Sequence, residues 1–182
     1  MITEEIFEKA AQIKLLLMDC DGVLTDGRIT FSPDGEEHKT FHVRDGFGIV
    51  SLHRAGIRSG IISGRASSVL ERRAKELGIE FVRQGSQNKL DDFEDILNQT
   101  GIKANETAFI GDDLPDIPLL LQVKLPVVVA DAAPETKQFA HLITQAKGGR
   151  GAVREVTDLI LQSQQKWLLL TKKYFDTTHQ NR

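Results

Sequence analysis

Residues 15–25 read LLLMDCDGVLT, an apolar run that ends in two aspartates and a glycine. The run predicts a buried strand, and side chains alternate across a strand, so Asp19 and Asp21 share one side while Cys20 points to the other. The two carboxylates then lie just beyond the carboxyl end of the strand, where α/β sheets keep their binding sites. This stretch therefore predicts an α/β sheet with an acidic site at its edge.

A second acidic group follows another apolar run. Residues 107–110 read TAFI and residues 111–116 read GDDLPD. Because the carboxyl ends of parallel strands meet at one edge of a sheet, this group is expected beside Asp19 and Asp21. Carboxylates packed this closely repel one another, so the pattern predicts a bound cation.

Apolar runs alternate with helical patterns along most of the chain. Strands are expected at residues 13–19, 57–62, 80–82, 107–110 and 127–130, and helices at 47–55, 67–77, 89–99 and 115–121. A short helix capped by Thr3 is expected before the first strand. The alternation implies right-handed βαβ crossovers and a parallel sheet, so the predicted fold is a three-layer α/β domain. A length of 182 residues is most simply one domain over residues 1–182.

Residues 28–43 break this alternation. Ile29 and Phe31 alternate with polar residues, as do Phe41 and Val43, and the turn sequence SPDG lies between them. The segment is therefore predicted to be a β-hairpin. An isolated hairpin is only marginally stable in water, so this one is expected to pack against another part of the protein or a partner.

The C-terminal helix and tail are expected to span about residues 152–182, with one helix over 152–175. Its apolar residues recur every seven positions, at Val153, Ile160, Trp167 and Tyr174. The end of this helix has more apolar surface than one flank of a small domain buries. An oligomer interface, or a tail inserted into a partner, would account for that surface.

Composition limits the classes of function. The chain has 23 basic and 26 acidic residues, a net charge of −3, so no nucleic-acid or anionic-membrane partner is expected. No apolar stretch approaches the ~18 residues of a membrane span. The single cysteine fits a reducing compartment. The chain is therefore expected to be a soluble, cytoplasmic protein that binds a small molecule.

Four motifs occur in order: DCDG at residues 19–22, IISGR at 61–65, Lys89 at the start of a predicted helix, and GDDLPD at 111–116. Over residues 13–150 this order resembles the haloacid dehalogenase (HAD) superfamily of phosphotransferases. The resemblance implies a Rossmann-like domain with phosphatase activity. HAD enzymes carry their smallest cap insertion where this chain has its hairpin. The resemblance therefore implies a capless enzyme whose site is open unless a neighbouring subunit covers it.

Asp19 is expected to be the nucleophile, because an aspartate with a reference pKa of ~3.9 is already ionised at neutral pH and needs no base. It would attack phosphorus and form an aspartyl-phosphate. Asp21 is expected to protonate the leaving alkoxide and later to deprotonate the hydrolytic water. The expected cofactor is Mg²⁺, bound by Asp19, Asp112 and the backbone carbonyl of Asp21. Asp113 and Asp116 are expected to support these ligands or to cap a helix.

Three residues are expected to bind the phosphate: Ser63 and Gly64 at a strand-to-helix turn, and Lys89 as a compact positive charge. Taken alone, Ser63 is equally a helix cap, and Lys89 is an ordinary surface lysine. Cys20 is expected to be a small buried residue, because a cysteine phosphatase needs an arginine six residues on, where this chain has Asp26.

Three longer stretches indicate the substrate: DCDGVLTDG at residues 19–27, FHVRDGFG at 41–48 and GGRGAVRE at 148–155. They resemble the HAD branch that hydrolyses 3-deoxy-D-manno-octulosonate 8-phosphate (Kdo-8-phosphate) in lipopolysaccharide biosynthesis. The resemblance implies a cytoplasmic homotetramer in which neighbouring subunits close each site. The substrate contacts that it implies are Asp21, Arg44, Asp45, Gly46, Arg65 and Arg73.

Arginine forks suit a substrate with a carboxylate at one end and a phosphate at the other. Arg65 and Arg73 are alternatively solvated helix residues. Two other functions stay open: a phosphatase of a nine-carbon ulosonate 9-phosphate, and a non-catalytic oligomeric module.

Overall fold

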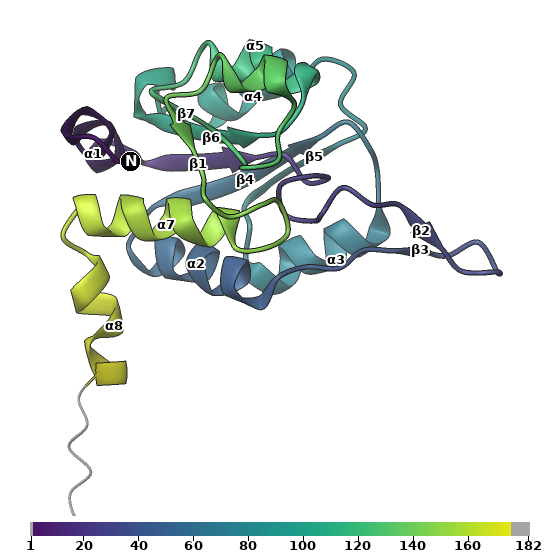
Figure 1. Cartoon of the computed structure of the whole chain (residues 1–182), viewed down its shortest axis with the longest axis horizontal. Coiled ribbons are helices and arrows are strands. Elements are labelled where there is room, and N and C mark those ends of the chain that lie inside the picture. Colours follow the sequence, from purple (N-terminus) through teal and green to yellow (C-terminus); the bar gives the residue numbers. More distant parts are fainter. Residues whose placement is uncertain (1, 176–182) are drawn as a thin grey trace, which may run out of the picture.

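Parallel strands form the centre of the molecule in the order β5-β4-β1-β6-β7-β8 (Figure 1). The computed structural model describes residues 2–175. The strands are β1 (Leu15–Met18), β4 (Arg58–Ser63), β5 (Phe81–Gln84), β6 (Thr107–Gly111), β7 (Leu125–Val128) and β8 (Leu142–Ile143). The predicted parallel α/β sheet is confirmed.

Helices cover both faces of this sheet (Figure 1). One face carries α2 (Val43–Arg54), α3 (Ser68–Leu77) and α7 (Ala152–Ser163), and the other carries α4 (Lys89–Thr100) and α5 (Ile117–Leu120). The remaining helices are α1 (Glu4–Ala11), α6 (Pro134–Lys137), α8 (Trp167–Phe175) and the short 3-10 helices η1 (Ala104–Glu106) and η2 (Leu114–Asp116). The predicted three-layer arrangement is therefore confirmed, as is the Thr3 cap of α1, whose hydroxyl accepts a hydrogen bond from the Ile6 amide.

Strand β1 is the structural basis of the site. It pairs with β4 on one side and β6 on the other, and all its side chains are buried. A strand buried on both faces needs a continuous apolar run, and the sequence LLLM supplies it. The Asp19 amide still donates to the Ile110 carbonyl at 3.0 Å, so the first aspartate leaves the sheet at a fixed position. Strands β1 and β6 therefore bring their following acidic residues to one edge.

Several predicted element boundaries are wrong. The first strand is shorter than residues 13–19, and the helix expected at 47–55 begins at Val43. The helix expected at 115–121 is divided into η2 and α5. Strand β8 and helix α6 were not predicted, because segments of two and four residues are too short to show a period.

The hairpin is also shorter than predicted. It consists of β2 (Thr30–Phe31) and β3 (Glu37–His38), and it projects away from the sheet (Figure 1). The expected alternation at Phe41 and Val43 is wrong: Phe41 packs against the main core, and Val43 begins α2. Both residues lie beyond the paired strands, with Phe41 in the connection to α2 and Val43 at the first position of that helix.

The expected single helix over residues 152–175 is divided. Helix α7 ends at Ser163, Gln165 adopts a positive φ of 57°, and α8 begins at Trp167. The Lys166 amide donates to the Leu161 carbonyl at 2.8 Å, which turns the chain so that α8 leads away from the sheet (Figure 1). The seven-residue period of the apolar side chains continues through this turn, so the period alone does not reveal it. The predicted tail at residues 176–182 lies outside the described residues.

Every helix within residues 2–175 is too short or too polar to cross a lipid bilayer.

Asp45 joins α2 to the start of α7. Its side chain is buried, and it accepts hydrogen bonds from the Arg154 amide at 2.7 Å and the Gly151 amide at 3.2 Å. Amides in the first turn of a helix have no carbonyl partner within that helix. Asp45 therefore caps α7 from a neighbouring helix and fixes the loop that precedes α7.

We predict that Asp45→Asn lowers the free energy of unfolding by about 1–3 kcal/mol, because one buried amide loses its acceptor. Urea denaturation measures the change. Arg44→Ala, on the exposed neighbouring residue, serves as the control and should stay within about 0.5 kcal/mol of wild type. Equal stability of the Asp45 variant and the control would show that this cap does not stabilise the fold.

Candidate active site

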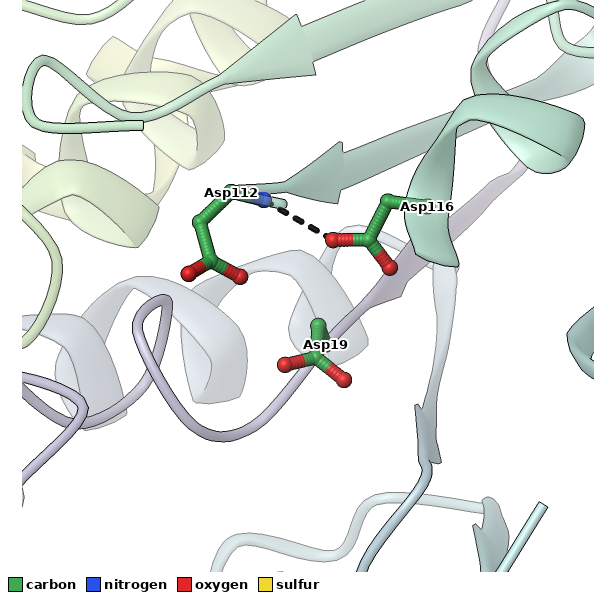
Figure 2. Close-up of side chains that lie close together, drawn as sticks. All are labelled: Asp19, Asp112 and Asp116. Carbon is green, nitrogen blue, oxygen red and sulfur yellow. Dashed lines mark hydrogen bonds between the residues drawn. The ribbon is translucent and has the colours of Figure 1, made fainter. Parts of the chain in front are cut away.

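Three carboxylates gather at the carboxyl edge of the sheet. Asp19 follows β1, Asp112 follows β6, and Asp116 lies in η2. Each offers an oxygen within 4.8 Å of the others, and Figure 2 shows the three side chains grouped together. The two acidic groups predicted to meet in space therefore do so.

Asp116 is held from two sides. Its Oδ2 accepts a hydrogen bond from the Asp112 amide at 2.8 Å, drawn in Figure 2, and its Oδ1 accepts one from Lys89 Nζ at 2.7 Å. Asp113 lies at the N-cap of η2, where it accepts from the Leu114 amide at 2.8 Å. The turn after β6 is thus fixed by its own carboxylates, and the Asp112 carboxylate stays available.

Lys89 supplies the positive charge of the cluster. It is the first residue of α4, which Asn88 caps by accepting from the Leu90 amide at 3.2 Å. Its Nζ donates to Asp19 Oδ1 at 2.6 Å as well as to Asp116. Burial lowers the pKa of Lys89, but the charges of Asp19 and Asp116 outweigh it and raise this pKa overall. Lys89 therefore stays charged and fixes the Asp19 carboxylate.

One ammonium does not balance three carboxylates. Burial raises the pKa of Asp112 to about 8, and the charges of Asp19 and Asp116 add to the effect. Burial also raises the pKa of Asp19 to about 6, although Lys89 opposes this shift. A divalent cation at this point would favour the ionised carboxylates, and hard cations such as Mg²⁺ prefer oxygen ligands. The donor set and its charge therefore fit Mg²⁺.

Glycines let the loop after β1 pack closely. Gly22 has a φ of +95°, and a Cβ there would lie 2.1 Å from Asp112 Oδ2. A Cβ on Gly148 would lie 1.7 Å from the Gly22 carbonyl oxygen, and the Gly149 amide donates to the Val23 carbonyl at 2.9 Å. The GGRG segment thus supports the acidic loop from behind, a role that its sequence alone did not indicate.

One pocket contains all the residues predicted for catalysis, phosphate binding and metal binding. Its lining consists of Asp19, Asp21, Ser63, Gly64, Arg65, Lys89, Asp112, Asp113, Pro115 and Asp116. Ser63 ends β4, and Ser67 occupies the N-cap position of α3 without a side-chain hydrogen bond to the helix, so a short loop separates Ser63 from α3. Arg65 was predicted to contact the sugar acid and had no other predicted role, and it also lines this pocket.

The other predicted sugar contacts lie elsewhere. Arg44 is exposed, and Asp45 is the buried cap of α7. Gly46 and Arg73 line a separate pocket together with Tyr174. The structure does not bring these four residues to the carboxylates within one chain, so their contact with the substrate stays a prediction.

Sequence reasoning missed two charged residues of the hairpin. Lys39 Nζ pairs with Asp21 Oδ1, and Glu37 Oε1 pairs with Arg65 Nη2 at 2.6 Å. The signal that could have found them is their spacing: Glu37 and Lys39 lie two residues apart, shortly before Phe41, which packs against the core. Two-residue spacing in an extended segment puts both side chains on one face.

Comparisons with known proteins agree with this class of fold and site. A family model described as haloacid dehalogenase-like hydrolase matches residues 73–156. The 3-deoxy-D-manno-octulosonate 8-phosphate phosphatase of Yersinia pestis is 47% identical over 165 residues, 91% of this chain and 88% of that protein.

Two solved structures are also similar to the chain. The Moraxella catarrhalis phosphatase of this name, in complex with a magnesium ion, a phosphate ion and KDO, is 40% identical with a TM-score of 0.92, over 94% of this chain and 99% of that one. The cobalt-bound Haemophilus influenzae phosphatase is 40% identical with a TM-score of 0.87, over 92% and 98%. The chain belongs to the 3-deoxy-D-manno-octulosonate 8-phosphate phosphatase family of the HAD-like hydrolases.

We predict opposite effects of Asp112→Asn on metal binding and on the stability of the metal-free protein. The folded-state pKa of about 8 exceeds the unfolded value of ~3.9, so Asp112 makes the metal-free protein less stable as pH rises toward 8. The variant removes this ionisation, so at pH 8 in EDTA it should unfold at a higher temperature than wild type. Calorimetric titration should show weaker Mg²⁺ binding.

Asp113→Asn is the matched control, because asparagine also caps a helix. Its metal-free unfolding temperature should follow the wild-type pH profile. An Asp112 variant that also follows the wild-type profile would contradict the charge crowding described here.

Proposed function

We propose that the chain is a Mg²⁺-dependent phosphatase that hydrolyses Kdo-8-phosphate to Kdo and inorganic phosphate, with residues 1–182 acting as one hydrolase domain. The observation that carries this proposal is the pairing of Lys89 with Asp19 in a pocket that also contains Asp21 and Asp112. Kdo-8-phosphate is proposed because relatives of that activity resemble nearly the whole chain.

Asp19 would act as the nucleophile. Its Oδ1 is fixed by Lys89, and the other oxygen attacks phosphorus as the bond to the sugar oxygen breaks. The product of this step is an aspartyl-phosphate at Asp19 and a free sugar acid. Asp19, Asp112 and the backbone carbonyl of Asp21 would hold Mg²⁺, which when bound offsets the charge of the phosphate and the carboxylates.

Asp21 would transfer the two protons of the reaction. In the first step it gives its proton to the sugar oxygen that leaves phosphorus. In the second step it takes a proton from the water that attacks the aspartyl-phosphate, which restores Asp19 and releases phosphate. The sum is one substrate and one water converted to one alcohol and one phosphate.

The pocket offers further groups for the substrate's two charged ends. Ser63, the Gly64 amide and Lys89 would bind the phosphate oxygens. Arg65, with its guanidinium half exposed at the pocket, suits the sugar-acid carboxylate. The substrate class is therefore a phosphorylated sugar acid. Its metabolic place would be lipopolysaccharide biosynthesis in the cytoplasm.

We also propose a homotetramer in which neighbouring subunits close each site. Two projecting segments expose apolar side chains: Phe31 is 61% exposed on the hairpin, and Leu169 is 80% exposed on α8. Apolar surface on segments that leave the body of the molecule is typical of subunit interfaces.

We predict that the wild-type protein hydrolyses Kdo-8-phosphate faster than a nine-carbon ulosonate 9-phosphate, and that EDTA abolishes the activity reversibly. Asp19→Asn should reduce kcat at least ~10³-fold, because the nucleophile is removed, while circular dichroism stays unchanged. Phosphate release with each substrate, with and without Mg²⁺, measures these effects. Faster hydrolysis of the nine-carbon ester would reassign the substrate, and full activity in EDTA would refute the metal-dependent mechanism.

We predict a mass close to four times the chain mass of 20.3 kDa in light scattering. Leu169→Asp should reduce this mass and raise KM for the sugar-acid phosphate, because the neighbour that closes the site is lost. Glu135→Gln, on the exposed surface of α6, is the control. A monomer mass for the active wild type would end the proposal that subunits close each other's sites.

A further inference from the structure

Four charged side chains join the hairpin to the pocket in a closed ring. Lys39 Nζ pairs with Asp21 Oδ1 and lies 3.6 Å from Glu37 Oε1. Glu37 Oε1 pairs with Arg65 Nη2 at 2.6 Å, and Arg65 Nε lies 3.5 Å from Asp21 Oδ2. The ring connects three segments of the chain: the loop after β1, the hairpin and the loop after β4.

Lys39 is the most enclosed member of this ring. Its side chain is 1% exposed, whereas the side chains of Glu37 and Asp21 are 15% and 18% exposed. A buried ammonium needs partner charges to offset its desolvation, so the position of Lys39 depends on its pairing with Asp21 and Glu37. Strands β2 and β3 pair over two residues each and do not fix the hairpin by themselves. The ring therefore fixes the hairpin and Asp21 relative to each other.

The two oxygens of Asp21 differ. Oδ1 pairs with Lys39 and accepts from the Thr25 hydroxyl at 3.4 Å. Oδ2 is buried and has no hydrogen-bond partner within residues 2–175, and Arg65 Nε lies 3.5 Å from it. A general acid must present one oxygen to the leaving group in a fixed direction. Lys39 and Thr25 therefore fix the orientation of the Asp21 carboxylate at the edge of the pocket.

We propose that Lys39 is a positioning residue, which holds the Asp21 carboxylate in the orientation from which it delivers the proton to the leaving sugar oxygen. Lys39 acts through Asp21, since its Nζ is enclosed by two carboxylates and the residue does not line the pocket as described above. This inference rests on the proposed phosphatase function. It makes the hairpin a part of the catalytic machinery, in addition to its proposed role between subunits.

If Lys39 positions Asp21, the effect of mutating Lys39 on kcat/KM should depend on how much the leaving group needs a proton. A sugar alkoxide needs a proton as it leaves, whereas p-nitrophenolate is stable enough to leave without one. The ratio kcat/KM covers the steps up to departure of the leaving group, so the later proton transfer from water does not enter it. Misplacing Asp21 should therefore lower kcat/KM for Kdo-8-phosphate much more than for p-nitrophenyl phosphate.

The test compares Lys39→Met with wild type on both substrates. Methionine keeps an apolar chain of similar length. We expect kcat/KM for Kdo-8-phosphate to fall about 10²-fold and that for p-nitrophenyl phosphate to fall less than about threefold. Thr40→Ala, on the exposed next residue, is the matched control and should leave both values unchanged. Lys39→Gln provides the same comparison if the methionine variant does not fold.

A double-mutant cycle separates positioning from other roles. In an Asp21→Asn background, Lys39→Met should cost nothing further in kcat/KM for Kdo-8-phosphate, because the group that it positions is already gone. Equal losses on the two substrates, or a full effect of Lys39→Met in that background, would overturn the inference while leaving the proposed function intact. A wild-type protein that does not hydrolyse Kdo-8-phosphate would instead refute the proposed function.

Discussion

The buried ammonium of Lys89 between Asp19 and Asp116 is the interaction on which the site depends. Without it, carboxylates delivered by two adjacent strands would face one another with no compensating charge. Both ion pairs are short and largely buried, so they fix the start of α4 against the ends of β1 and β6. The same contact that stabilises this edge of the sheet also orients Asp19, the proposed nucleophile.

The sheet edge and the projecting segments have different proposed roles. Strands β1 and β6, with Gly22 that lets Asp112 pack closely, determine where the proposed phosphate chemistry takes place. The hairpin and α8 project from this body and expose apolar side chains. The proposed phosphate chemistry therefore lies at the edge of the sheet, and the proposed closure of each site by neighbouring subunits depends on the projecting parts.

Sequence predicted the sheet and its acidic edge because both leave local signals. Apolar runs precede Asp19 and Asp112 and predict strands that end at these two carboxylates. Contacts between distant segments leave no such signal. The cap that Asp45 provides for α7 and the pairing of Lys39 with Asp21 depend on tertiary structure, so neither was found. The break near Gln165 was missed because it preserves the seven-residue period of the apolar side chains.

The central claim is that Asp19, oriented by Lys89, becomes phosphorylated during turnover. The most direct measurement stops the enzyme with acid while it hydrolyses Kdo-8-phosphate and reduces the protein with borohydride, which converts an aspartyl-phosphate to homoserine. Peptide mass spectrometry then locates the change. The account predicts homoserine at position 19 in wild type and none in Asp19→Asn. Homoserine at another aspartate, or at no position under conditions of rapid turnover, would contradict it.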